Sequence, residues 1–330
     1  MERSSGVKWF RLTGWQKIIL YLGLTMVLGS LLAPWLFQLG KETVRQGWLA
    51  NGPAPLTYLH GALERSPFSR YFNRAVMVVA LIGLAILIPS LNFRGWRDLK
   101  IFKNPCAVMD VTAGVLLAAG FLLFMGAGFL YMGFFVPEAE ADWGIIPKLI
   151  LTAVAVGIVE EVFFRGAILG ICLRRMKVLN AVILTSGLFA LIHFLKPKLK
   201  IADHEVTWTT GLDALGLAFS QFQDLPAVTA QFLTLFALGV VLAITRLRTR
   251  SLWLPMGLHA GWVLGYELFK KNTDASASIA QWAPWVGADL KIGVIPLIII
   301  AITGALASLW IDLSRRPIYE DTPSSQDQET

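Results

Sequence analysis

The chain has 330 residues, of which 55% are hydrophobic and only 15% are charged, and its formal net charge is +7. Because a soluble domain usually carries about 25% charged residues, this composition excludes a pair of soluble domains and indicates a polytopic membrane protein. The positive charge does not indicate nucleic-acid binding, since the Lys and Arg residues cluster in short loops between apolar runs, as topology signals do. The two cysteines, Cys106 and Cys172, have neither metal-binding nor redox spacing.

A membrane-spanning helix needs ~20 mainly apolar residues, and the sequence contains about eight such runs. The predicted spans are 18–38, 75–92, 108–135, 145–170, 178–195, 227–245, 251–269 and 292–313. The predicted fold is therefore all-α, a bundle of about eight transmembrane helices that forms one membrane domain. The first run follows basic residues, but it is too long for a signal peptide and further spans follow, so we expect an uncleaved first span.

The loops between the predicted spans alternate in charge. Basic loops follow the second, fourth, sixth and eighth spans, and acidic or mixed loops follow the third and fifth. The positive-inside rule then places both termini in the cytoplasm, and the expected location is a bacterial inner or plasma membrane. The loop at 40–74 departs from this pattern, because its basic residues lie on the predicted outer side. Residues 56–74 and 211–223 could be interfacial amphipathic helices or ordinary loops, and the polar tail 319–330 is predicted to be disordered.

Beyond Lys148 near its start, the fourth predicted span contains three charged residues: Glu160, Glu161 and Arg165. Each charge at membrane depth costs roughly 2.5–3.5 kcal/mol on insertion scales, so such residues are functional candidates by default. On a helix Glu161 and Arg165 are four residues apart and can pair, which predicts a buried packing network. Glu160 is turned ~100° away from that face and has Phe164 as its neighbour four residues on. The local sequence therefore predicts Glu160 as a general base or acid.

Two of the four histidines also lie inside predicted spans. His193 ends the sequence FALIH at 189–193, and His259 begins the sequence HAGWV at 259–263. A single histidine in a span is often only a hydrogen-bonding residue between helices. Together with the glutamates, however, two histidines could meet in one water-accessible cavity, where they would activate water for attack on a carbonyl or hold a metal.

These motifs resemble those of the CAAX protease and bacteriocin-processing family, also called CPBP or Abi. The sequence EEVFFR at 160–165 matches its EExxxR motif, Phe189 to His193 matches FxxxH, and His259 matches the histidine of the third motif. The likeness covers roughly residues 141–270, with order and spacing kept. The predicted organisation is therefore N-terminal helices in 1–140, a protease-like core in 141–270, and a last helix and tail in 271–330.

The resemblance implies an all-helical membrane bundle around a conical cavity, with peptide-bond hydrolysis as its activity. It implies that Glu160 and His193 activate water and that His259 stabilises the oxyanion. Glu161, Arg165 and Phe189 would support this site. The implied partners are a peptide or membrane-protein substrate and the lipid bilayer.

One position departs from the family pattern. Many members have HxxxN as the third motif, and here the last position is Val263. Valine cannot donate a hydrogen bond, and the loss of one oxyanion donor can cost ~100-fold or more in rate. Either another donor serves, for instance the indole N–H of Trp262, or the enzyme is slow, or the site has another use.

The sequence leaves two further choices open. Glu160, His193 and His259 could bind zinc with an open position, but the HExxH motif of zinc proteases is absent from the sequence, and the resemblance favours catalysis without a metal. The alternatives to an endopeptidase are a non-enzymatic bacteriocin-immunity or scaffold protein and, with less support, an ion-coupled transporter.

Overall fold

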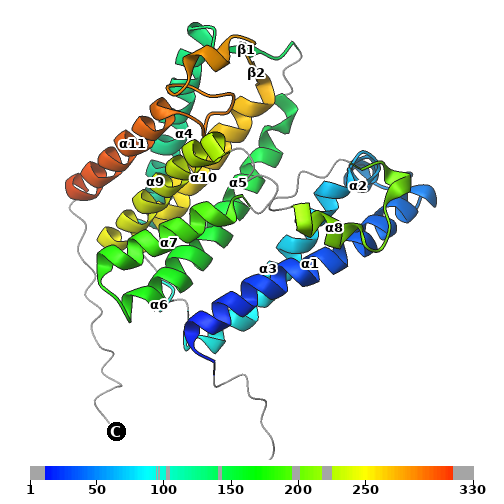
Figure 1. The fold of residues 1–330 in the computed structure, drawn as a ribbon, viewed down its shortest axis with the longest axis horizontal. Helices are drawn as coiled ribbons and strands as arrows, with labels where there is room; N and C mark the ends of the chain where they lie inside the picture. The colour runs from blue at the N-terminus through cyan, green and yellow to red at the C-terminus, as the bar shows by residue number, and fades with distance from the viewer. Residues whose placement is uncertain are drawn as a thin grey trace, which may run out of the picture. The chain divides into compact units, whose positions relative to one another are not determined.

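The computed structural model describes residues 12–93, 95, 97–101, 105–139, 143–194, 201–217 and 225–314. In this part of the chain the fold is helical apart from one short two-stranded sheet (Figure 1). The helices are α1 (Gly14–Arg45), α2 (Ala54–Glu64), α3 (Phe68–Ser90), α4 (Ala107–Tyr131), α5 (Ile146–Glu161), α6 (Leu169–Leu173), α7 (Val178–Ile192), α8 (Thr210–Leu217), α9 (Leu225–Thr249), α10 (Trp253–Asn272) and α11 (Val294–Leu313). The all-α membrane fold is thereby confirmed, and the predicted disordered tail at 319–330 lies outside the described residues.

Each predicted span coincides with a helix or with consecutive helical segments. Among the described residues, five helices (α1, α3, α4, α9 and α11) are long and apolar enough to cross a membrane by length and composition. The fourth predicted span is interrupted, because a π-helix at Val162–Ile168 joins α5 to α6. Helix α7 has only 15 residues, and α10 carries His259 and other polar side chains that lower its hydropathy.

Two predicted boundaries are wrong. The third span was expected to reach residue 135, but α4 ends at Tyr131, because the chain turns at Gly133 with φ +71° and enters strand β1 (Phe135–Pro137). The amphipathic stretch 56–74 is not one helix, since Pro67 caps the start of α3 and separates it from α2. Of the stretch 211–223, residues up to Leu217 belong to α8 and the rest lies outside the described residues.

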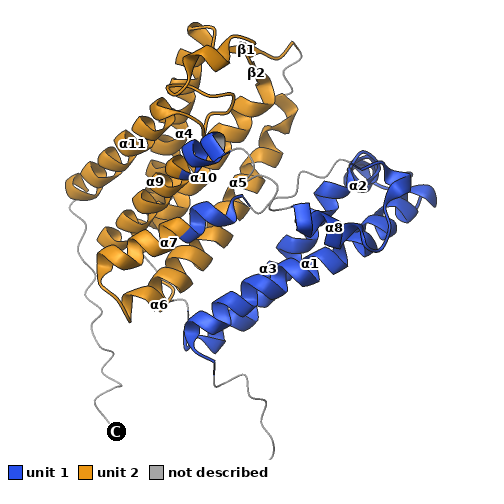
Figure 2. Cartoon of the chain, in the orientation of Figure 1, with its two compact units in different colours: residues 1–95, 188–232 blue, residues 96–187, 233–330 orange. Residues whose placement is uncertain are grey.

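The chain forms two compact units (Figure 2). Unit 1 comprises residues 1–95 and 188–232, and unit 2 comprises residues 96–187 and 233–330. The two units are defined by contacts between residues. The predicted segments 1–140, 141–270 and 271–330 are instead defined by the positions of the sequence motifs. The division falls within α7 and α9, so each of these helices contributes to both units.

Unit 1 is built on the antiparallel pair α1 and α3, with α8 packed on α1. A Cβ atom at Gly211 of α8 would lie only 1.9 Å from the carbonyl oxygen of Ser30, so glycine is needed at this crossing. The Nζ atom of Lys41 lies 2.7 Å from Oδ2 of Asp203. This ion pair joins the end of α1, which carries Lys41, to the segment that precedes α8.

Unit 2 has α10 at its centre, packed against both α4 and α5. Because lipid is as apolar as the side chains of the helices, close van der Waals packing stabilises such contacts, and small residues allow it. Strand β1 pairs antiparallel with β2 (Thr273–Ala275) and ties the end of α4 to the end of α10. A hydrophobic cluster with members from α4, α9, α10 and α11 forms the core of the unit.

Candidate functional site

The ion pair between Glu161 and Arg165 lies completely inside unit 2. Both side chains are 0% exposed, and Nη1 of Arg165 donates to Oε1 of Glu161 at 2.8 Å. A second donor, Nη2 of Arg165, bonds the carbonyl oxygen of Gly239 in α9 at 3.2 Å. The guanidinium group thus links the helix that carries the glutamates to α9, and its charge is balanced by the adjacent carboxylate.

The backbone around Arg165 is a π-helix, which the sequence analysis did not predict. The π-helix runs from Val162 to Ile168, begins directly after Glu161, and every one of its residues is buried. Its end is marked by a bond from the N–H of Leu169 to the carbonyl of Phe164, five residues back. π-Helical turns are rare overall, and those that occur are often at functional sites. The EExxxR motif therefore differs from a regular apolar helix in its backbone as well as in its charge.

Two glycines bring α10 close enough to place His259 beside the glutamates. A Cβ atom at Gly257 would lie 2.4 Å from the carbonyl oxygen of Val111 in α4, and one at Gly157 of α5 would lie 3.1 Å from the carbonyl oxygen of Met256. A side chain at either position would force the helices apart. The backbone of α10 is therefore held against α4 and α5 within one turn of His259.

His259 is only 3% exposed and contacts both glutamates. Its Nδ1 atom lies 2.8 Å from Oε1 of Glu161, and its Nε2 atom lies 3.8 Å from Oε2 of Glu160. The same oxygen, Oε1 of Glu161, accepts from Nη1 of Arg165, so Nδ1 of His259 is assigned as the donor in this contact. The orientation of the imidazole is thus set by Glu161, and its second nitrogen faces Glu160 across a gap longer than a direct hydrogen bond.

The group thus brings two carboxyl groups, one guanidinium and one imidazole together. The carboxyl of Glu160 and Nε2 of His259 face each other at 3.8 Å.

Glu160 differs from Glu161 in its surroundings. Its side chain is 30% exposed, whereas that of Glu161 is 0% exposed. Glu160 has His259 beside it, which the local sequence could not predict. Glu160 is thus the carboxylate that remains within reach of water or a substrate.

His193 lies at the end of α7 and is described here within unit 1. Its Nδ1 atom is 2.8 Å from the carbonyl oxygen of Phe189, and the two rings pack with centroids 4.5 Å apart. A carbonyl only accepts, so Nδ1 carries the hydrogen in this bond. Phe189, completely buried, therefore fixes both the position and the tautomer of His193, which explains physically why a residue four positions earlier belongs to this motif.

Val263 stands where the third motif has a hydrogen-bond donor, and Trp262 is the alternative donor. These two residues lie in different surroundings. Trp262 is 3% exposed and belongs to the hydrophobic cluster of unit 2. Val263 is half-buried and follows His259 by four residues, so it lies on the same face of α10. An oxyanion donor from Trp262 remains a prediction, and the packing of its ring favours a structural contribution.

A metal ion at this site would have to be held by the same side chains. In the described ranges no group of three or more His, Cys, Asp or Glu side chains is arranged to hold a metal ion. Within unit 2, Nδ1 of His259 and the carboxylate of Glu161 are already bonded to each other. We therefore derive no step through a metal, and zinc stays a matter for the chelation experiment below.

The motifs, the buried charges and the two histidines can now be compared with known proteins. Residues 142–265 match the family model described as type II CAAX prenyl endopeptidase, Rce1-like. The core of the chain is CAAX protease-like. The resemblance drawn from the EExxxR and FxxxH motifs is thereby confirmed, and the membrane location of the chain agrees with it. No curated protein and no solved structure matches the chain.

Sequence reasoning missed the bond between Glu161 and His259. The two residues are separated by 98 positions, and no local pattern links residues so far apart. The glycines at 157 and 257 offered a signal, because small residues on two spans indicate close helix approach. The CAAX protease-like core thus contains a connected group of four side chains, Glu160, Glu161, Arg165 and His259, within one unit.

Proposed function

We propose that the protein is an intramembrane endopeptidase that hydrolyses a peptide bond near the membrane. The observation that carries this proposal is the placement of His259, held through Nδ1 by Glu161 with Nε2 facing the half-buried Glu160. A carboxylate and an imidazole that face each other supply a base and a donor, the two groups that peptide hydrolysis needs. The match of residues 142–265 to a peptidase family supports this reading.

In the proposed reaction, Glu160 is the general base. A water molecule gives one proton to the carboxylate of Glu160, and the motif resemblance assigns His193 to the same activation step. The water oxygen forms a bond to the carbonyl carbon of the substrate. The electron pair of the carbonyl moves onto its oxygen, which becomes an oxyanion.

The oxyanion is stabilised by His259. With Glu160 ionised at the start, His259 carries a hydrogen on Nε2 and a positive charge, so it donates to the developing negative oxygen. The tetrahedral intermediate then collapses, the carbon–nitrogen bond breaks, and the leaving nitrogen takes the proton held by Glu160. The carboxylate is regenerated, and the products are a new carboxyl terminus and a new amino terminus.

The proposed roles of Glu160 and His259 depend on each other. A general base requires Glu160 without its proton, and an oxyanion donor requires His259 with a hydrogen on Nε2. Glu161 and Arg165 are positioning residues in this scheme, because they orient His259 and balance its charge without touching the substrate. The substrate is a peptide or a membrane protein that reaches the site from the bilayer.

The proposal is tested by mapping new protein termini in cells that express the wild type, Glu160→Gln or His193→Ala. Glu267→Gln serves as the matched control, because Glu267 is a half-buried glutamate on α10 outside the group. We expect a small set of termini that are present with the wild type and the control and lost with both site variants. The same termini in all four samples would contradict a protease and favour an immunity or scaffold protein, and charge movement in liposomes that Glu160→Gln abolishes would favour a transporter.

A further inference from the structure

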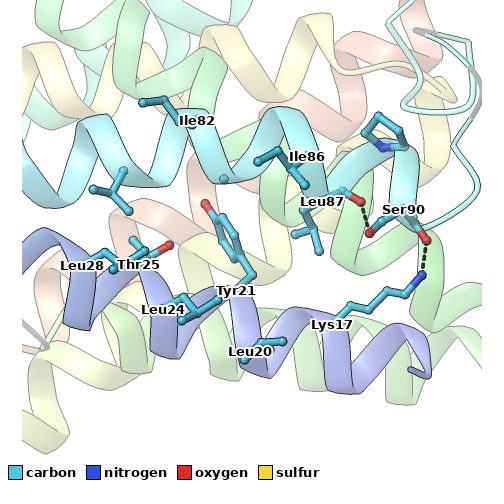
Figure 3. Close-up of a pocket in the computed structure, with 13 residues that line it drawn as sticks. Lys17, Leu20, Tyr21, Leu24, Thr25, Leu28, Ile82, Ile86, Leu87 and Ser90 are labelled. Carbon is cyan, nitrogen blue, oxygen red and sulfur yellow. Dashed lines mark hydrogen bonds between the residues drawn. The ribbon is translucent and has the colours of Figure 1, made fainter. Parts of the chain in front are cut away.

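A groove in unit 1 lies between α1 and α3, at the end where α1 begins and α3 ends (Figure 3). Its volume is about 680 Å³, within the range of about 300–1,000 Å³ that is usual for ligand sites. The lining is almost entirely apolar along its length. Several lining side chains remain open, including Ile82 at 61% and Ile86 at 69% exposure.

The groove exists because the two helices touch closely at one point and are held apart beyond it. A Cβ atom at Gly29 would lie 2.7 Å from Val76, so the helices are in backbone contact there. Farther along, the ring of Tyr21 stands between them, and its hydroxyl donates to the carbonyl oxygen of Ala80 at 3.0 Å (Figure 3). The ring keeps the helices at a fixed separation and so preserves the hollow beside it.

A single charged side chain stands at the mouth of the groove. Nζ of Lys17 donates to the carbonyl oxygen of Ser90, which joins the start of α1 to the end of α3 (Figure 3). An ammonium group has three donors, so two remain for another acceptor. The adjoining sequence is also basic: Arg3, Lys8 and Arg11 precede Lys17, and Arg94, Arg97 and Lys100 follow Ser90.

We propose that this groove binds an anionic phospholipid, with an acyl chain along the apolar lining and the phosphate at Lys17. Clusters of basic residues beside a transmembrane helix attract anionic lipid headgroups, and an ammonium group binds phosphate as a point charge. An acyl chain covers the open apolar side chains without any polar group being buried. This site lies outside the catalytic group, and the inference does not depend on proteolytic activity.

A second groove, between α4 and α11 of unit 2, serves as an internal control. Its volume is about 710 Å³, similar to that of the first groove. Its described lining residues are also apolar and include neither lysine nor arginine, while Lys103, Arg315 and Arg316 adjoin them in the sequence. Among the described lining residues the two grooves therefore differ in Lys17, which should give the first groove the stronger preference for an anionic lipid over a zwitterionic one.

The test uses the full chain in phosphatidylcholine vesicles with a small fraction of a photoactivatable lipid. The probe is either phosphatidylglycerol or phosphatidylcholine, with the same diazirine-bearing acyl chain, and labelled peptides are mapped by mass spectrometry. One cationic side chain near an anionic headgroup is worth about fivefold in occupancy. We expect the phosphatidylglycerol probe to label α1 and α3 about fivefold more than the phosphatidylcholine probe, and the two probes to differ less in their labelling of α4 and α11.

Variants separate charge from shape. Lys17→Ala should reduce the preference for phosphatidylglycerol to about onefold, and Lys17→Arg should restore it. Leu24→Trp, which adds volume to the groove, should reduce labelling by both probes, whereas Leu116→Trp in the second groove should leave labelling of α1 and α3 unchanged. Equal labelling of α1 and α3 by the two probes, a preference that survives Lys17→Ala, or no labelling of the groove at all would overturn the proposal.

Discussion

Nδ1 of His259 lies 2.8 Å from Oε1 of Glu161, so the histidine of the third motif is held by the second glutamate of the first. The same oxygen accepts from Nη1 of Arg165 at 2.8 Å. Glu161 therefore connects a structural ion pair to a catalytic candidate. In the proposed mechanism the adjacent glutamates have separate tasks, in which Glu161 orients His259 and Glu160 is the general base.

The buried ion pair should be far more important for stability than an exposed one. Glu161→Gln leaves the guanidinium of Arg165 buried with a weaker partner, and such a loss costs about 3–5 kcal/mol. The matched control is Glu42→Gln, which breaks the exposed pair of Glu42 with Arg45 and should leave the unfolding temperature close to that of the wild type, because solvent screens exposed ion pairs. Thermal unfolding of both variants in the same detergent measures the difference, and equal shifts would show that the buried pair is dispensable.

Val263→Asn should make the protein faster. Asparagine at this position adds a side-chain N–H one turn beyond His259, on the same face of α10, and one oxyanion donor is worth about 100-fold in rate. Trp262→Phe removes the indole N–H while it keeps most of the ring in the apolar cluster, and we expect its kcat to stay within about threefold of the wild type. A large loss of kcat in Trp262→Phe would instead identify the indole as the donor.

Gly257→Ala should separate α10 from α4. The added methyl would lie 2.4 Å from the carbonyl oxygen of Val111, and overpacking of this kind costs about 1–3 kcal/mol. Because Gly257 is two residues from His259, cleavage should fall as well. The control is Gly120→Ala in α4, where an added Cβ has nothing within 4 Å. The unfolding temperature and the cleavage rate of the control should match the wild type, and equal behaviour of the two variants would contradict the close crossing.

Exhaustive treatment with a strong zinc chelator should leave cleavage unchanged. The proposed reaction obtains its base from Glu160 and its oxyanion donor from His259, so neither task requires a metal. The measurement is the cleavage rate before and after chelation, with the metal content of the treated protein determined in parallel. Complete loss of activity that only added zinc restores would replace this mechanism with a metal-dependent one.

The helices could be predicted because long apolar runs have few alternatives in a membrane. The pairing of Glu161 with Arg165 could also be predicted, since residues four apart on a helix are neighbours. The π-helix could not, because its residues are as apolar as those of an ordinary span. The end of α4 was missed for a similar reason: residues 132–135 remain apolar, and only the backbone of Gly133 turns the chain.

The contacts of His259 lay beyond the reach of local pattern. Spacing along one helix predicted that Glu160 points away from Arg165, but it left the neighbours of Glu160 open. Its neighbour His259 comes from a helix that begins more than 90 residues later. Only the packing of α10 against α5, made close by Gly157, brings the two together. The types and order of residues along the chain thus indicated which side chains form the candidate site, and the tertiary structure shows which of them contact one another.

The most direct test of the central claim is the single-turnover cleavage rate of Glu160→Gln, measured in liposomes on a substrate identified from the new termini. Glutamine keeps the size of the side chain but cannot take a proton from water, and a general base contributes about 10²–10⁴-fold. We predict a loss in that range with an unfolding temperature close to that of the wild type. A rate within about threefold of the wild type would contradict the assignment of Glu160 as the base.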